Sequence, residues 1–149
     1  MLTGGCACRA IRYEYDGPLL LSYKCHCLDC QAASGGGHAA LCWARMGEFS
    51  FVRGRPKFHR GVGSSGKEVA RGFCGTCGAP IVALLGVLPG ILGILASSLD
   101  EPAAFQPRYE IWTSRARPWD VLDPALERLE GNFPAEIARR YLVGQQPSG

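Results

Sequence analysis

Several short segments alternate hydrophobic with polar residues, which is the pattern of half-buried β-strands. Residues 9–15 read RAIRYEY, with an apolar or aromatic side chain at every second position before an Asp-Gly-Pro turn. Short segments at 19–24, 49–52 and 68–73 predict further strands, and residues 107–114 alternate again as a strand. The pattern therefore predicts a mainly β protein.

Helical spacing is restricted to the C-terminal part of the chain. Apolar pairs follow a proline in residues 124–129 and again in residues 134–142, and proline suits the first turn of a helix. We therefore expect a β domain over residues 1–123 and a short helical appendage with a tail over residues 124–149. The total of 149 residues is near the usual size of one domain.

Residues 79–99 form the longest apolar stretch and carry no charge, so they are long enough to span a bilayer as a helix. Prolines and glycines interrupt this stretch repeatedly, however. Pro89-Gly90 separates two apolar runs, 84–88 and 91–95, which predicts a turn between two buried strands. We expect a buried hairpin and no membrane association; a membrane span is the alternative.

Composition and charge exclude other classes of protein. A chain that is 47% hydrophobic is too apolar to be disordered, and 20 Gly with 10 Pro are too many for a helical bundle. The net charge of +3 is uneven, with 10 Lys or Arg against 5 Asp or Glu in residues 1–78, and 6 against 8 afterwards. Since no basic tract accompanies this charge, we expect no nucleic-acid partner.

The 8 cysteines carry the candidate chemistry. Nothing near Met1 marks export, so we expect a cytoplasmic location, where clustered thiols more often bind metal than form disulfides. Cys42 stands alone in an apolar run and is expected to be a buried side chain. The other seven form three groups: Cys6-x-Cys8, Cys25-x-Cys27-x-x-Cys30 and Cys74-x-x-Cys77.

Two of these groups together have the spacing of a closed zinc site. The turn between Cys74 and Cys77 directs two thiolates at one ion, and Gly78 accepts a backbone shape that side chains resist. In an extended strand Cys6 and Cys8 would share one face and supply the other pair. We expect a structural zinc that joins the two segments; a redox pair and an iron–sulfur cluster are the alternatives.

The middle group supplies three thiolates, Cys25, Cys27 and Cys30, with no fourth cysteine close by in sequence. Three protein ligands and one open position are the arrangement of a catalytic zinc. The alternative is a second structural site closed by Cys42 or His38.

The charge of such a site indicates which chemistry it suits. Zinc with three thiolates carries one net negative charge, so it polarises a carbonyl or a water weakly and suits binding of a fourth thiol. In an extended stretch His26 points away from its cysteine neighbours, so we expect it to support the site, with a proton shuttle or ligand as the alternative. The middle group therefore indicates thiol chemistry over hydrolysis.

In this order the motifs resemble those of the glutathione-dependent formaldehyde-activating enzyme family, whose wider group includes centromere protein V. The resemblance covers most of the chain and implies a β-tent fold stapled by two Zn²⁺ ions. The resemblance rests on these motifs: GGCAC at 4–8 with IRY at 11–13, CHCLDCQ at 25–31 with SG at 34–35, RGFCGTCG at 71–78, SLDEP at 98–102, and SRARPW at 114–119.

The resemblance also implies roles for these residues. It gives the structural zinc to Cys6, Cys8, Cys74 and Cys77 and the catalytic zinc to Cys25, Cys27 and Cys30. The implied activity is that of a carbon–sulfur lyase, which combines formaldehyde or a small aldehyde with glutathione into S-hydroxymethylglutathione. The glutathione sulfur would attack the aldehyde carbon. A non-catalytic zinc-stapled binding module of the same wider group is the alternative.

An anionic thiol such as glutathione would suit the basic centre of the chain, but we expect most of these basic side chains to lie on the solvated surface. No partner is evident for His59, and we assign it no role. The basic residues of this central region are Arg45, Arg53, Arg55, Lys57, Arg60 and Arg71.

Overall fold

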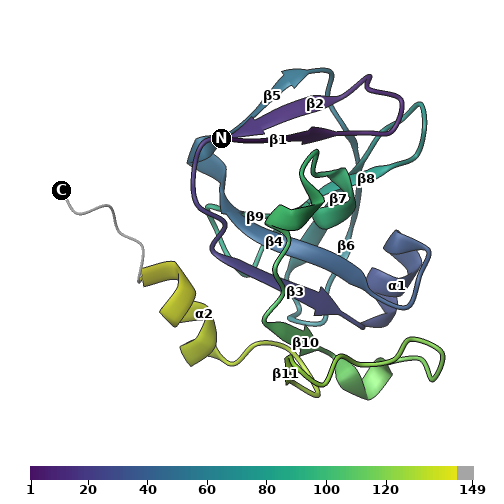
Figure 1. Cartoon of the computed structure of the whole chain (residues 1–149), viewed down its shortest axis with the longest axis vertical. Helices are drawn as coiled ribbons and strands as arrows, with labels where there is room; N and C mark the ends of the chain where they lie inside the picture. The colour runs from purple at the N-terminus through teal and green to yellow at the C-terminus, as the bar shows by residue number, and fades with distance from the viewer. Residues whose placement is uncertain (144–149) are drawn as a thin grey trace.

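The computed structural model describes residues 1–143, which form two β-sheets. The smaller sheet is antiparallel and lies at the top of Figure 1. Its strand order is β1-β2-β5, with β1 at Leu2–Gly5, β2 at Arg12–Tyr15 and β5 at Phe49–Arg53. The predicted tail beyond residue 143 lies outside the described residues.

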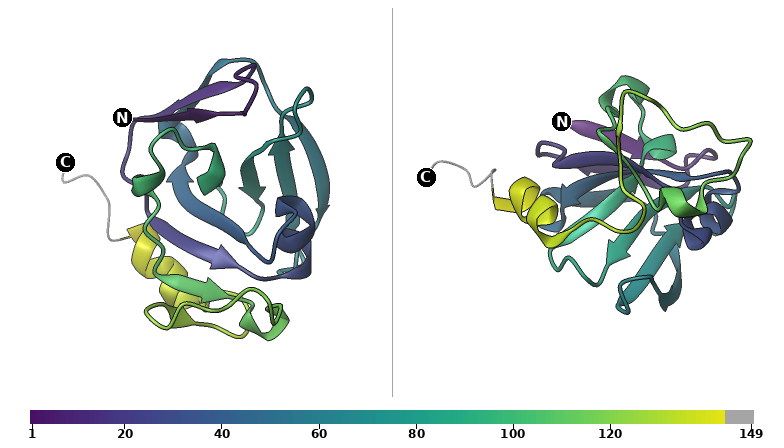
Figure 2. Two further views of the ribbon diagram at one scale, coloured as in Figure 1. Left: turned by 45° about the vertical axis from the view of Figure 1, so that its right-hand side comes forward. Right: turned by 90° about the horizontal axis from the view of Figure 1, so that it is seen from below.

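The larger sheet has eight strands in the order β11-β10-β3-β4-β9-β8-β7-β6 and is strongly curved (Figure 2). β10 runs parallel to both of its neighbours, and the other pairs are antiparallel. The strands are β3 (Leu21–Cys25), β4 (Ala39–Arg45), β6 (Lys57–Val62), β7 (Glu68–Phe73), β8 (Pro80–Leu85), β9 (Ile91–Leu95), β10 (Tyr109–Ile111) and β11 (Glu127–Arg128).

Two α-helices and four short 3₁₀ turns complete the described chain. The helix α1 connects β3 to β4, and α2 packs beside the β10 end of the large sheet (Figure 1). The helices span Leu28–Ser34 and Ala135–Val143, and the turns span Met46–Glu48, Ala96–Ser98, Pro102–Ala104 and Thr113–Arg115.

Hydrophobic cores form on both faces of the large sheet, because successive side chains of a strand point to opposite faces. In β4, Cys42 and Ala44 belong to the core that includes Tyr13 of the small sheet. Leu41 and Trp43 belong to the other core, against which α2 packs. Burial of each large apolar side chain stabilises the fold by about 1.5–3 kcal/mol. The prediction of a mainly β protein is confirmed.

The predicted apolar hairpin is also confirmed, with different bounds. β8 and β9 pair through Val82 with Ile94 and through Leu84 with Leu92. The first strand starts and ends earlier than expected, so residues 86–90 form a longer turn, in which Gly90 has a left-handed φ of 81°. Within residues 1–143, no helix has the length and apolar character needed to cross a membrane.

The prediction that only the C-terminal part is helical is wrong, because Leu28–Ser34 forms α1. Cys27 caps this helix by accepting a hydrogen bond from the Cys30 backbone N–H at 3.3 Å, and Asp29 lies in the first turn, where the helix dipole favours a negative charge. Gly35 ends the helix with a left-handed φ of 74°. The helix is too short for an apolar period to reveal it.

The predicted helix over residues 124–129 is wrong as well. Glu127 and Arg128 form β11, which pairs in register with Tyr109 and Glu110 of β10. This segment forms a strand because it pairs with the backbone edge of β10. No pattern within the segment itself indicates that pairing. The helix predicted over residues 134–142 is confirmed as α2, and the division of the chain at residue 123 stays a prediction.

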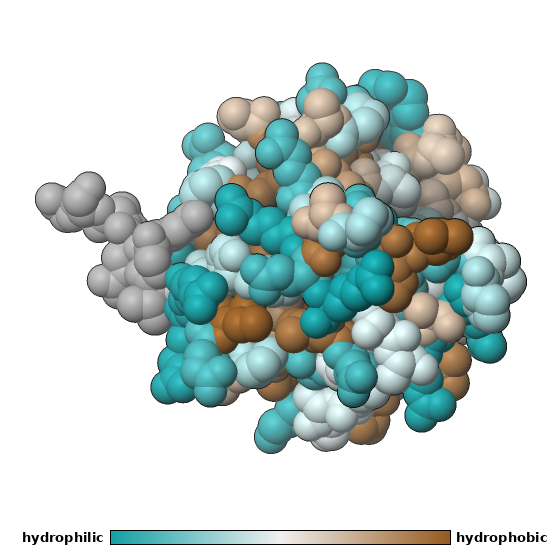
Figure 3. Space-filling model, turned by 60° about the horizontal axis from the view of Figure 1, so that its bottom comes forward, coloured by the Kyte–Doolittle hydropathy of each residue, from teal (hydrophilic) through white to brown (hydrophobic). Residues whose placement is uncertain are grey.

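Exposed apolar side chains come from separate parts of the chain, including Leu28, Val52, Val87 and Val121. On the face shown in Figure 3, hydrophobic groups are separated by hydrophilic residues. Single exposed apolar side chains of this kind are normal on a folded protein.

Candidate metal centres

The first cysteine cluster joins the turn between β1 and β2 to the turn between β7 and β8. The Sγ atoms of Cys6, Cys8, Cys74 and Cys77 all lie within 4.8 Å of one another. The Sγ of Cys8 lies 3.6 Å from that of Cys6 and 3.8 Å from that of Cys74. The four thiols that spacing grouped together are therefore close enough to hold one metal ion.

The route by which Cys6 and Cys8 meet differs from the prediction of an extended strand. The Arg9 backbone N–H donates to the Cys6 carbonyl at 3.1 Å, so the segment turns, and Arg9 takes a left-handed φ of 64°. The Ile11 N–H donates to the Cys6 Sγ at 3.2 Å. Thus a tight turn, not the alternation of a strand, directs both thiols to one side.

Backbone N–H groups favour the charged form of these thiols. The N–H groups of Cys77 and Thr76 donate to the Cys74 Sγ and hold the pKa of that thiol below its ordinary value. Gly78 has a left-handed φ of 77°, as the sequence predicts. Four converging sulfurs with N–H donors fit a soft or borderline ion such as Zn²⁺.

The second cysteine cluster comes from one short segment. Cys25 ends β3, Cys27 caps α1, and Cys30 lies in the first turn of that helix; the three Sγ atoms lie within 4.8 Å of one another. Within the described chain, neither Cys42 nor His38 joins this group. Cys42 is fully buried and accepts a hydrogen bond from Ser22 at 3.4 Å, as expected of a core residue.

Charge is distributed unequally among the three thiols. Contacts with Cys25 and Cys30 lower the pKa of Cys27 to about 2, and contacts with Cys27 and Cys30 raise the pKa of Cys25. Cys25 lowers the pKa of Cys30, but Cys27 and burial raise it more, to about 11. One thiolate is thus stabilised by two neutral thiols, and a cation that replaces their protons would meet three sulfur ligands.

The three thiols line a cavity of about 910 Å³ on the face of the large sheet that packs against α2. This volume lies near the upper end of the roughly 300–1,000 Å³ range of ligand pockets. Aromatic and aliphatic side chains, Trp43 and Leu41 among them, form much of its wall. Its ionisable lining residues besides the cysteines and tyrosine are Asp29, His59, Arg71 and Arg139.

Sequence reasoning found only part of this lining. Of the six basic residues in the centre of the chain, Arg71 lines the cavity and the other five do not. His59 also lines it, because His59 of β6 lies opposite Arg71 of β7. That register could have been inferred by pairing the two strands. Arg139 reaches the cavity from α2, and no pattern in the sequence indicates where that helix packs.

Comparison with known proteins decides the family. The model of the family described as "Glutathione-dependent formaldehyde-activating enzyme" matches residues 1–115, well over half of the chain. The chain belongs to this family. The resemblance inferred from its motifs is therefore confirmed. No curated protein matches the chain.

A solved structure supports the fold of this family member. The chain is similar to the crystal structure of a Rhodobacter sphaeroides protein, with 20% sequence identity and a TM-score of 0.55. The match covers 85% of this chain and 98% of that chain, and at this identity it concerns the fold alone. The family match includes all the clustered cysteines and ends before α2, so Arg139 lies beyond it.

Proposed function

We propose that this protein is a zinc-dependent carbon–sulfur lyase that combines formaldehyde or another small aldehyde with glutathione. One observation carries the proposal: three thiols, Cys25, Cys27 and Cys30, converge on a cavity of about 910 Å³ with no fourth metal-binding side chain in their group among the described residues. Membership of the family supports glutathione and formaldehyde as the substrates.

In this proposal the two cysteine clusters hold two zinc ions with different tasks. Cys6, Cys8, Cys74 and Cys77 would complete the ligand shell of a structural ion. Cys25, Cys27 and Cys30 would hold the catalytic ion, which when bound keeps a substrate thiol as a thiolate at its open position. A reducing compartment such as the cytoplasm would keep these thiols available for metal.

The charges around the cavity match those of glutathione, which has two carboxylates and one ammonium group. Arg71 and Arg139 are the candidate partners of the carboxylates, since a guanidinium binds a carboxylate with two parallel hydrogen bonds. Asp29 is the candidate partner of the ammonium group. The apolar wall would keep water away from the reacting sulfur and carbon.

The reaction forms one carbon–sulfur bond. The thiolate sulfur donates an electron pair to the aldehyde carbon, and the π pair of the carbonyl moves to its oxygen. That oxygen then takes up one proton, which balances the proton that the thiol lost. No atom leaves and no net oxidation occurs, so the chemistry needs no redox partner.

The test is the rate at which the hemithioacetal forms from formaldehyde and glutathione. Zinc-loaded protein should raise this rate above the spontaneous reaction, and Cys25→Ser should return it to the spontaneous value. A rate equal to the spontaneous one with glutathione and with several other small thiols would overturn the proposal.

A further inference from the structure

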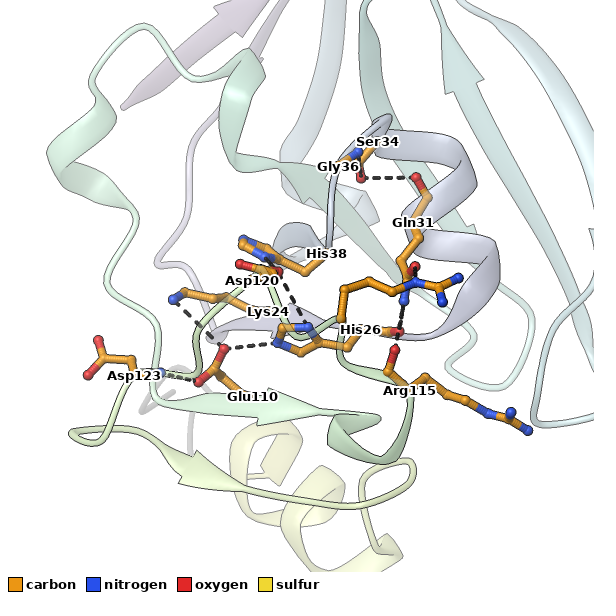
Figure 4. Close-up of polar contacts among 11 residues, drawn as sticks. Lys24, His26, Gln31, Ser34, Gly36, His38, Glu110, Arg115, Asp120 and Asp123 are labelled. Carbon is orange, nitrogen blue, oxygen red and sulfur yellow. Dashed lines mark hydrogen bonds and ion pairs between the residues drawn. The ribbon is translucent and has the colours of Figure 1, made fainter.

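A third cluster of metal-binding side chains, separate from the two cysteine clusters, lies next to the β3–α1 junction and takes no part in the proposed reaction. His26 lies between two of the cysteines, His38 precedes β4, and Asp120 lies in the loop that follows the Thr113–Arg115 turn. One ligand atom from each lies within 4.8 Å of the other two. Figure 4 shows these three side chains converging, with Glu110 on the far side of the His26 ring.

One nitrogen of His26 is held by a carboxylate. The Nε2 of His26 lies 2.9 Å from Oε1 of Glu110, and both side chains are almost completely buried. The other oxygen of Glu110 accepts the Asp123 backbone N–H at 2.7 Å, and Lys24 Nζ lies 3.9 Å from Oε1. Both contacts suit a carboxylate acceptor, so we assign the proton between Glu110 and His26 to Nε2 of His26.

The other nitrogen of His26 has no hydrogen-bond partner although it is buried. This Nδ1 lies 3.6 Å from Oδ2 of Asp120, and the same oxygen lies 2.6 Å from Nδ1 of His38. With the proton on Nε2, the lone pair of Nδ1 faces a carboxylate. A buried acceptor that faces a carboxylate is unfavourable unless a cation lies between them, even though the Asp120 side chain is partly exposed.

The ligand atoms indicate which kind of cation would suit this cluster. A histidine that binds a metal through one nitrogen almost always donates its other N–H to a carboxylate or carbonyl, which is the relation of His26 to Glu110. Two imidazole nitrogens and one carboxylate oxygen form a ligand set for borderline divalent ions such as Zn²⁺, Fe²⁺ and Co²⁺. Glu110 and Asp120 also place two negative charges in this region, whereas Lys24 supplies one positive charge.

We propose that His26, His38 and Asp120 bind one divalent transition-metal ion, with Glu110 positioning His26. The ion would tie the loop that carries Asp120 to the junction that carries the three thiols. The same junction is already linked by Gln31, whose Nε2 donates to the carbonyl of His26 at 2.8 Å and to that of Arg115 at 3.0 Å.

The chain has 3 histidines, so imidazole ¹⁵N NMR can follow each of them separately. The experiment adds Zn²⁺ to protein whose cysteine clusters are already loaded with zinc. One further equivalent should move His26 Nδ1 and a ring nitrogen of His38 to metal-bound shifts. His59, which is exposed on β6, should not move.

Variants separate this site from the cysteine clusters. Asp120→Asn should weaken binding of the additional Zn²⁺ about tenfold or more. The same variant, loaded with Co²⁺, should keep the sulfur-to-cobalt absorption of the cysteine clusters. His59→Ala is the matched control and should bind the additional ion as the wild type does.

Two results would overturn the proposal. One is a pair of His26 and His38 signals that added Zn²⁺ does not move. The other is an Asp120→Asn variant that binds the additional ion as tightly as the wild type. If Asp120→Asn does not fold, His38→Gln carries the same expectations, because the His38 side chain is 28% exposed and lies at the edge of the cluster.

Discussion

The two cysteine clusters have the same ligand atom and differ in how the chain presents it. The four-sulfur cluster is built from two turns far apart in sequence, and Cys8 and Cys77 lie at the surface. The three-sulfur cluster comes from one segment, 25–30, and lines the large cavity. A complete set of metal ligands from two distant segments holds those segments together, whereas an incomplete set beside a cavity leaves room for a substrate.

Removing a ligand of the four-sulfur cluster should have the largest effect. Cys74→Ser would leave an incomplete site between the β1–β2 and β7–β8 turns. A structural zinc contributes on the order of 10 kcal/mol, similar to the whole stability of a domain. We therefore expect loss of folded structure or of most of the thermal stability, measured by circular dichroism and zinc content.

Cys42→Ala is the control for that variant, because Cys42 is a buried cysteine outside both clusters. It should lower the free energy of unfolding by about 1 kcal/mol and leave the zinc content unchanged. A Cys74→Ser protein that melts within a few degrees of the wild type would contradict the structural role of this cluster.

Removing a ligand of the three-sulfur cluster should affect chemistry and leave the fold intact. Cys25→Ser should lose one zinc per chain and at least about 100-fold in kcat/KM, or about 3 kcal/mol of transition-state stabilisation. A mild chelator should produce the same one-zinc state in the wild type. Simultaneous loss of both ions and of folded structure would show that the two clusters are not separable.

The charged cavity residues should affect binding more than turnover. Arg71→Met removes one candidate partner of a glutathione carboxylate, so we expect KM for glutathione to rise about tenfold, with kcat little changed. Steady-state kinetics with varied glutathione measure this effect. Arg53→Met is the matched control, because Arg53 is exposed and does not line the cavity. Equal effects of the two variants would argue against specific recognition by Arg71.

The smallest effect is expected at Asp100, which links the small sheet to the segment after β9. Hydrogen bonds from Arg12 and Thr3 lower the pKa of Asp100 to about 2. Because the folded pKa is lowered, the carboxylate stabilises the fold above about pH 4, and this contribution is lost as the pH falls toward 2.

Asp100→Asn should therefore cost at most about 1 kcal/mol at neutral pH, since the Asp100 side chain is 42% exposed. Urea denaturation of both proteins should show the difference shrinking below pH 4. A difference that grows with acidity would have the wrong sign.

The parts of the molecule that sequence predicted are those set by local spacing. The C-x-x-C turn with Gly78 and the Pro89-Gly90 turn each impose their geometry on a few neighbouring residues, so these features could be read directly. The pairing of distant cysteines followed from the number of ligands that zinc requires.

The parts that sequence missed depend on contacts between distant segments. Residues 127–128 form a strand because the edge of β10 accepts them, and Arg139 reaches the cavity because α2 packs there. The buried pair of His26 and Glu110 joins two residues that are 84 positions apart. The α1 helix was not predicted for another reason: its seven residues are too few to show an apolar period, so its local signals are the caps at Cys27 and Gly35.

The most direct test of the central claim asks whether the three-sulfur cluster accepts a fourth sulfur. In protein loaded with Co²⁺, only the seven cysteine sulfurs should contribute sulfur-to-metal absorption. Glutathione should raise this absorption by about one-seventh, as one more sulfur joins. S-methylglutathione, which has no thiol, should leave it unchanged. An absorption that glutathione does not alter would contradict the account.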